Sequence, residues 1–188
     1  MAKQDVIVGL DIGTTKVVAC VGSHREGSIE IRAIVKAPNS GLRRGMIVDI
    51  EDTVSAVSAV LEEAERIANT PLVSAYIGIG GAHISSTLSK GVIAVSRADG
   101  EITDPDIARV IEASQAVAMP PNQEILHVIP IAYTLDGQEG IKDPLGMNGV
   151  RLEVETHVIG GSAAAIKNLS KCVVQAGLEI DDLIFSPL

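Results

Sequence analysis

The chain has 188 residues, of which 46% are hydrophobic and 2% aromatic, and its formal net charge is -9. This length allows one domain with a small insertion, around a core of aliphatic side chains. The acidic balance, with no cationic run longer than Arg43-Arg44, argues against nucleic-acid binding. No run approaches the roughly 20 apolar residues of a membrane span. Cys20 and Cys172 lie in apolar segments, which predicts buried free thiols in a reducing cytoplasm.

The N-terminal residues predict three consecutive strands. Val6–Leu10 is a short apolar run, and Val17–Val21 is a second one after a turn. Apolar and polar residues alternate over Ser28–Lys36, which is typical of a third strand. Short connections between three strands predict an antiparallel meander.

A helix and a fourth strand are predicted next. After a loop over Ala37–Ile50, apolar residues recur every three or four positions from Glu51-Asp52 onward, and Asn69-Thr70-Pro71 is a helix stop. Val73–Ile79 predicts a buried strand.

The C-terminal part predicts one more helix and one more strand. Gly160-Gly161 leads to Ser162, a suitable N-cap, and Gly177 suits the position just past the helix end. Leu178–Phe185 is the last predicted strand.

Residues 82–158, between these parts, predict a module of their own. Ile84–Arg97 indicates one or two strands with a break at Lys90-Gly91, and a helix starts at Asp104-Pro105. Glu124–Leu135 predicts a strand, in which Pro130 indicates an edge or a bulge.

A glycine-rich loop is expected over 136–149, followed by a strand over 150–158 in which charged residues alternate with apolar ones. The predicted insertion is therefore a strand–helix–strand–strand α/β module, and the fold class of the whole chain is α/β.

The turn between the first two strands has the sequence Asp-Ile-Gly-Thr-Thr-Lys, which favours phosphate binding over an ordinary hairpin turn. Gly13 allows close backbone approach to a phosphate, and Thr14 and Thr15 add hydroxyl donors. Lys16 supplies a positive charge. Asp11 is expected to hold the water shell of a Mg²⁺ that bridges the phosphates.

The sequence at 9–16, Gly-Leu-Asp-Ile-Gly-Thr-Thr-Lys, resembles the phosphate-1 loop of the actin, Hsp70 and sugar-kinase superfamily. The order of elements resembles one half of its duplicated, ribonuclease-H-like fold. In actin, Hsp70 and MreB an extra subdomain lies between the third strand and the first helix, an interval that holds only Ala37–Ile50 here. The extra module at 82–158 follows the fourth strand instead, as in the FtsA family of bacterial cell-division proteins.

Two local segments resemble the same family. Ser40–Gly45 with Asp49 resembles its connection before the first helix, and Ile77–Gly81 with His83 resembles its passage into the inserted subdomain. The resemblance implies that 1–81 plus 159–188 form the first half of an actin-like ATPase domain.

The resemblance also implies a function. FtsA proteins bind ATP and Mg²⁺, anchor FtsZ filaments at the inner face of the cell membrane at the division site, and recruit late division proteins. Contacts to those proteins, and self-association, are expected through 82–158, where Pro130, Met147, Arg151 and Glu153 are candidate contact residues. FtsZ binding and membrane attachment are expected through a second half and a C-terminal amphipathic helix that this chain does not contain.

The chain is expected to be an N-terminal piece, with at most weak ATPase activity in the full-length protein. One lip of a cleft cannot enclose a nucleotide, so the piece alone is expected to show no saturable ATP binding. A sugar kinase shares the phosphate turn but needs a sugar pocket with a catalytic carboxylate, for which no candidate stands out. The pilus-assembly PilM family, another actin-like adaptor, is a second alternative.

Overall fold

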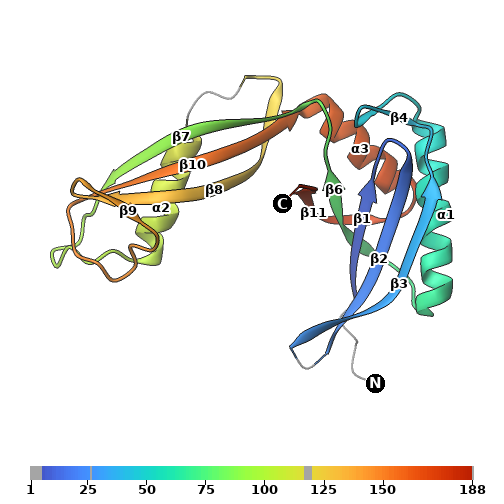
Figure 1. Cartoon of the computed structure of the whole chain (residues 1–188), viewed down its shortest axis with the longest axis horizontal. Coiled ribbons are helices and arrows are strands. Elements are labelled where there is room, and N and C mark those ends of the chain that lie inside the picture. The colour runs from blue at the N-terminus through green and yellow to red at the C-terminus, as the bar shows by residue number, and fades with distance from the viewer. Residues whose placement is uncertain (1–5, 26, 117–119, 188) are drawn as a thin grey trace. The chain divides into compact units, whose positions relative to one another are not determined.

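The computed structural model describes residues 6–25, 27–116 and 120–187 (Figure 1). The chain divides into two compact units. One contains the residues up to Ile84 together with those from Ser162 onward, and the other is Ser85–Gly161. Across the described residues, no helix is long and apolar enough to cross a membrane.

A five-stranded sheet forms the centre of the first unit, with the strand order β11-β6-β1-β2-β3. Its strands are β1 (Val6–Ile12), β2 (Lys16–Arg25), β3 (Ser28–Pro38), β6 (Ser74–Ile79) and β11 (Glu179–Phe185). The first three pair antiparallel, as the meander predicts, whereas β6 pairs parallel with β1 and β11 pairs parallel with β6.

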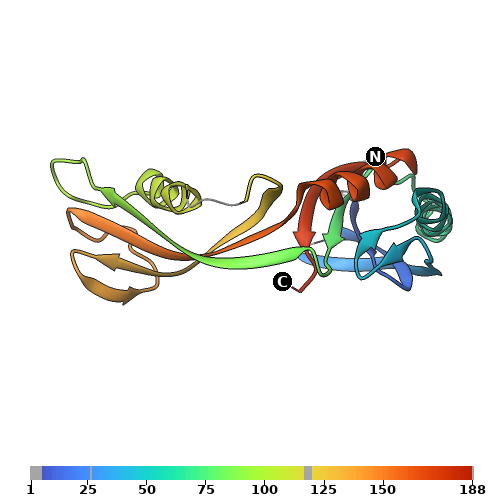
Figure 2. The ribbon, with the colours of Figure 1, turned by 90° about the horizontal axis from the view of Figure 1, so that it is seen from above.

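Two helices cover one face of this sheet. Helix α1 (Ile50–Ala68) contacts β2 and β3, and α3 (Ala163–Gln175) contacts both β11 and α1, so the two helices lie on the same side (Figure 2). The apolar strand residues that face them are buried, among them Leu10, Val17 and Ile77, each no more than 1% exposed. The apolar residues of the strands and of the two helices therefore pack together in one aliphatic core.

The helix ends fit the sequence signals closely. The Asp49 carboxylate accepts a hydrogen bond from the Asp52 N–H (3.0 Å) at the start of α1. Asn69 closes α1 in the left-handed region with φ 51°. Gly177, just past α3, has φ 89°, as expected for a glycine at this position. Ser162 is the N-cap residue of α3, but its side chain makes no capping hydrogen bond.

The loop predicted over Ala37–Ile50 contains two short strands. β4 (Leu42–Arg43) and β5 (Met46–Ile47) pair antiparallel, and Arg44-Gly45 forms the two-residue turn between them. Strands of two residues show no hydrophobic period, so the sequence pattern misses them.

The second unit is a four-stranded sheet with one helix on one face (Figure 2). Its elements are β7 (Ile84–Ala94), α2 (Asp104–Gln115), β8 (Gln123–Leu135), β9 (Gln138–Ile141) and β10 (Arg151–Ser162), and the strand order is β7-β10-β8-β9. A cluster of buried aliphatic residues, including Ile102, Val110 and Leu152, fills the space between sheet and helix.

Three predictions for this unit need correction. Strand β7 continues through Lys90-Gly91, where a break was predicted. The loop over 136–149 contains the additional strand β9, and β10 extends to Ser162.

Gly91 explains the first correction. A Cβ at this position would lie 2.1 Å from the Val110 carbonyl oxygen and 2.7 Å from the Ser114 nitrogen. The glycine therefore marks close approach of the α2 backbone to an unbroken strand.

The prediction for Pro130 is confirmed. β9 pairs with β8 only around Tyr133 and Leu135, with a register shift between them. Pro130 lies beyond that pairing, on a part of β8 where no ladder bond from β9 is lost.

Candidate functional site

The phosphate turn is a tight hairpin at the end of β1 and β2. Ile12 lies opposite Val17, and the Gly13 N–H donates to the Lys16 carbonyl oxygen at 2.9 Å. The hairpin therefore already uses this N–H, which is not free to donate to a ligand. A Cβ at Gly13 would lie 3.1 Å from the Lys16 oxygen, so a larger residue would crowd the hairpin.

Asn39 holds this turn from behind. Its side chain is buried, and its Nδ2 donates to the Gly13 carbonyl oxygen (2.9 Å). Its backbone N–H donates to the Thr15 oxygen (3.0 Å), and its Oδ1 accepts from the Gly41 N–H (3.1 Å). One buried amide therefore fixes the turn to the loop that precedes α1.

Asp11 lies beside the turn, at the point where three strands meet. It is aligned with Gly78 of the parallel neighbour β6. Its Oδ1 accepts a hydrogen bond from the Ser186 hydroxyl at 3.0 Å. A Cβ at Gly78 would lie 2.9 Å from both of these side-chain oxygens, so glycine makes room for the pair.

The turn Arg44-Gly45 packs against both the phosphate turn and the end of β6. The Gly45 N–H donates to Thr14 Oγ1 (3.1 Å), which leaves the hydroxyl proton available to a ligand. The Arg44 carbonyl oxygen accepts from the Ala82 N–H (3.2 Å). A Cβ on Gly45 would lie 2.4 Å from the Gly80 carbonyl oxygen, so the two backbones are in direct contact.

These segments enclose a cleft of about 370 Å³. It is lined by Asp11, Ile12, Gly13, Thr14, Arg44, Gly45, Gly80, Gly81, Ala82 and Ser186. Of these residues, only Asp11 and Arg44 carry a charge. Glycines at three of its edges allow backbone to approach a ligand closely.

The lining fits a phosphate chain with Mg²⁺. Hydroxyls, backbone groups and one guanidinium suit phosphate oxygens. The described residues contain no group of three or more His, Cys, Asp or Glu that could hold a metal by themselves. A single carboxylate suits Mg²⁺, which keeps several waters and takes other ligands from phosphates. In such a complex Asp11 would hold the hydrated ion.

The predicted residues divide between the cleft and its surroundings. Asp11, Gly13 and Thr14 line it, whereas Thr15 and Lys16 do not. Lys16 is the exposed first residue of β2, opposite Pro38.

A shallow apolar hollow of about 480 Å³ adjoins Asp11 on the face of the sheet opposite the helices. Val18, Cys20, Tyr76 and Ile184 contribute to its lining. Tyr76 is 45% exposed. The acidic side chain thus lies at the boundary between an apolar surface and the polar cleft.

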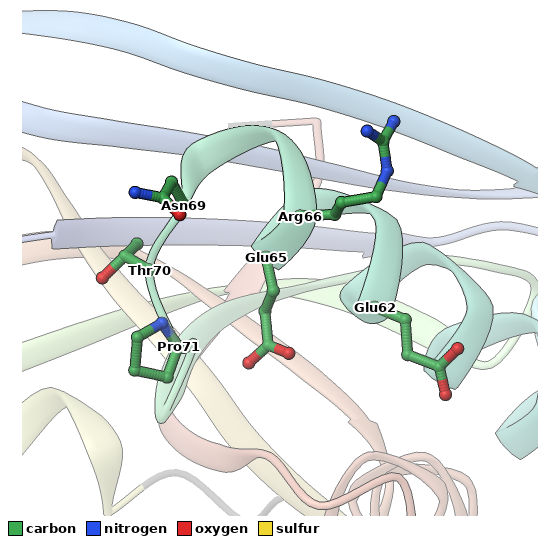
Figure 3. Close-up of a pocket in the computed structure, with 6 residues that line it drawn as sticks. All are labelled: Glu62, Glu65, Arg66, Asn69, Thr70 and Pro71. Atoms are coloured by element: carbon green, nitrogen blue, oxygen red, sulfur yellow. The ribbon is translucent and has the colours of Figure 1, made fainter.

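Another hollow, of about 540 Å³, lies at the end of α1 (Figure 3). In this view the Arg66 side chain points away from those of Glu62 and Glu65. Glu65 is already used structurally, because its Oε1 accepts from the Leu72 N–H at 2.8 Å and its carbonyl oxygen accepts from the Thr70 N–H. The side chains around this hollow therefore serve to end helix α1, and we assign the hollow no ligand.

The candidate contact residues of the insertion do not form one cluster. Arg151 and Glu153, on β10, form an ion pair at 3.2 Å. Pro130 is exposed on β8, whereas Met147 packs against the core of the unit. Glu153 also lines a small hollow of about 200 Å³ together with Lys90 and other side chains of the sheet.

Sequence reasoning missed Asn39 and Ser186 and gave Arg44 no role. Asn39 follows Pro38 in a loop, where asparagine is common, and Ser186 is 175 residues away from Asp11. The unusual signal is at Arg44, where an arginine precedes a glycine in a two-residue turn.

The comparisons with known proteins agree with this architecture. Residues 81–160 match the family model described as the SHS2 domain inserted in FtsA. The chain is 45% identical to the cell division protein FtsA of Pseudomonas aeruginosa, over 97% of this chain and 44% of that protein. It is 41% identical to that of Bacillus subtilis, over 100% of this chain and 43% of that protein.

One solved structure, titled as the PilM–PilN type IV pilus biogenesis complex, matches with a TM-score of 0.60 at 17% identity. The match covers 96% of this chain and 47% of that one, and it shows the shared actin-like fold alone. The sequence identity, in contrast, is to FtsA proteins, of which this chain spans less than half the length. Nearly all of the chain is therefore similar to part of the FtsA cell-division proteins of bacteria, and residues 81–160 match the domain inserted in that family.

Proposed function

We propose that the full-length protein is an actin-like cell-division adaptor that binds Mg²⁺-ATP, anchors FtsZ filaments at the membrane and recruits later division proteins. Nucleotide then acts as a ligand that selects a conformation or an assembly state. The observation that carries the nucleotide part is the cleft in which Asp11, Thr14 and Ser186 converge.

The chemistry of the cleft favours binding over turnover. Beyond Asp11, none of the described residues that line it offers a carboxylate, and this carboxylate already accepts a hydrogen bond from the Ser186 hydroxyl. A phosphotransferase needs a positioned base within reach of the group that attacks the phosphate. The FtsA relatives likewise favour an adaptor over the sugar-kinase alternative.

The insertion supports the adaptor part of the proposal. It is a compact unit with its own core, and it matches the inserted domain of FtsA along its length. A compact unit of this kind can carry a partner-binding surface of its own.

Vesicle recruitment tests this function. Purified full-length protein, FtsZ and lipid vesicles are mixed with ATP, and FtsZ in the vesicle fraction is measured after flotation. We expect FtsZ filaments to float only when the protein is present. FtsZ that stays in solution at saturating protein would contradict the anchoring function.

A further inference from the structure

Arg44 occupies a backbone position that arginine rarely adopts. The two residues of the turn between β4 and β5 both have positive φ, 52° for Arg44 and 78° for Gly45. Two positive φ values are typical of type I′ turns, whose first central residue is usually Asn, Asp or Gly. An arginine here is locally unfavourable, and such departures concentrate at functional positions.

The contacts of the turn hold Arg44 at the cleft. On one side Gly45 donates to the Thr14 hydroxyl, and on the other the Arg44 carbonyl oxygen accepts from Ala82. Gly81, with φ 131°, has its Cα so close that a Cβ on Gly45 would lie 2.5 Å from it. The backbone of the turn therefore cannot shift away without breaking its hydrogen bonds to Thr14 and Ala82.

Charge supplies the reason for an arginine. Arg44 is the one cation among the described residues that line the cleft, and Asp11 is the one anion. The Arg44 side chain is exposed, and the ion pairs found among the described residues do not include Arg44. Lys16, the cation of the phosphate turn itself, does not line the cleft.

We propose that Arg44 is a phosphate-binding residue of the nucleotide site, whose guanidinium donates to oxygens of the phosphate chain across the cleft from Thr14. A guanidinium offers paired N–H donors that match two phosphate oxygens. This inference rests on the proposed nucleotide function and adds to it a cation from outside the phosphate turn.

The test compares two variants of the full-length protein by titration calorimetry with Mg²⁺-ATP and with adenosine. In Arg44→Asn the side chain suits a positive φ, so the turn is retained while the cation is lost. In Arg43→Asn, the matched control, an exposed arginine of β4 that does not line the cleft is removed. Thermal unfolding without nucleotide checks that both variants are folded.

We expect Arg44→Asn to weaken ATP binding by about tenfold or more, as the loss of a charged hydrogen bond predicts. Adenosine binding should stay unchanged, and the salt dependence of ATP binding should become shallower. Arg43→Asn should bind ATP within about twofold of wild type, because its side chain lies outside the cleft.

If Arg44→Asn binds ATP like the wild type, the proposal that Arg44 binds phosphate is wrong, whereas the proposed nucleotide function is unaffected. Equal weakening of ATP and adenosine binding would also overturn it, because the loss would then be structural. If the wild type itself binds no ATP, the proposed nucleotide function fails as well.

Discussion

At the scale of single residues, the cleft depends on side chains that contact the phosphate turn from elsewhere in the chain. Asn39 links the turn to the loop before α1, because its Nδ2 donates to Gly13 and its Oδ1 accepts from Gly41, and the Ser186 hydroxyl donates to the carboxylate of Asp11. Neither residue carries a charge. Both act by fixing groups that would otherwise be free to rotate, which prepares a site before its ligand arrives.

Asn39→Ala should lower the free energy of unfolding by about 1–3 kcal/mol, because the Gly13 oxygen and the Gly41 N–H lose their partner while partly or fully buried. Urea unfolding measures the change. Ser40→Ala is the matched control, since its exposed hydroxyl bonds only to Asp52 on the surface, and it should cost at most about 0.5 kcal/mol. Equal effects of the two substitutions would contradict the bracing role of Asn39.

At the scale of elements, α2 depends on a carboxylate in its first turn. Asp106 is buried, and its Oδ2 accepts from both the N–H (3.0 Å) and the hydroxyl (2.7 Å) of Thr103, while Arg109 donates to its Oδ1 (2.6 Å). The hydrogen bonds from Thr103, followed by that from Arg109, lower the pKa of Asp106. The helix start is thus tied to an ionised side chain.

Asp106→Ala should therefore reduce the free energy of unfolding at pH 7 by about 1–2 kcal/mol, the usual worth of a helix cap. The folded-state pKa is lower than the unfolded one, so this stabilisation is complete above the unfolded value and is lost as the pH falls through the folded value. Unfolding at pH 7 and at pH 3 measures it. Asp104→Ala, in the same turn but exposed, should have a smaller effect. If Asp106→Ala lowered the free energy of unfolding by the same amount at pH 3 as at pH 7, the stabilising role of the ionised Asp106 would be wrong.

A second prediction for elements concerns the contact of β7 with α2. Gly91→Ala should destabilise the second unit by about 1–3 kcal/mol or more, because the added carbon meets helix backbone at Val110 and Ser114 rather than a flexible side chain. Gly9→Ala is the control, since a Cβ there has nothing within 4 Å, and it should change stability by less than about 1 kcal/mol. Thermal unfolding followed by circular dichroism compares them, and an innocuous Gly91→Ala would show that the two backbones are not in contact.

At the scale of the whole molecule, local patterns predicted much of the architecture and distant contacts could not be predicted. The meander and both helices of the first unit follow from hydrophobic periods within single segments. Strands β4, β5 and β9 are too short to show a hydrophobic period. A glycine such as Gly91 is compatible both with a break in a strand and with close contact to a helix, so the sequence alone does not distinguish the two.

The site divides in the same way. Asp11, Gly13 and Thr14 can be expected to lie together from the sequence alone, because the phosphate turn is continuous in sequence. Asn39, Arg44 and Ser186 reach it only through the packing of the sheet and of a turn between two short strands. The binding roles of all these residues, and of the candidate contact residues on the insertion, remain predictions.

The central claim is that this cleft forms the phosphate and Mg²⁺ side of an ATP site. It is tested most directly by the affinity of full-length protein for ATP with and without Mg²⁺, measured by calorimetry for the wild type, Asp11→Asn and the exposed control Glu51→Gln. Because Asp11 would hold the hydrated ion, Mg²⁺ should tighten ATP binding in the wild type and the control by about tenfold or more, but not in Asp11→Asn. An Asp11→Asn protein that keeps the full Mg²⁺ effect would contradict the account.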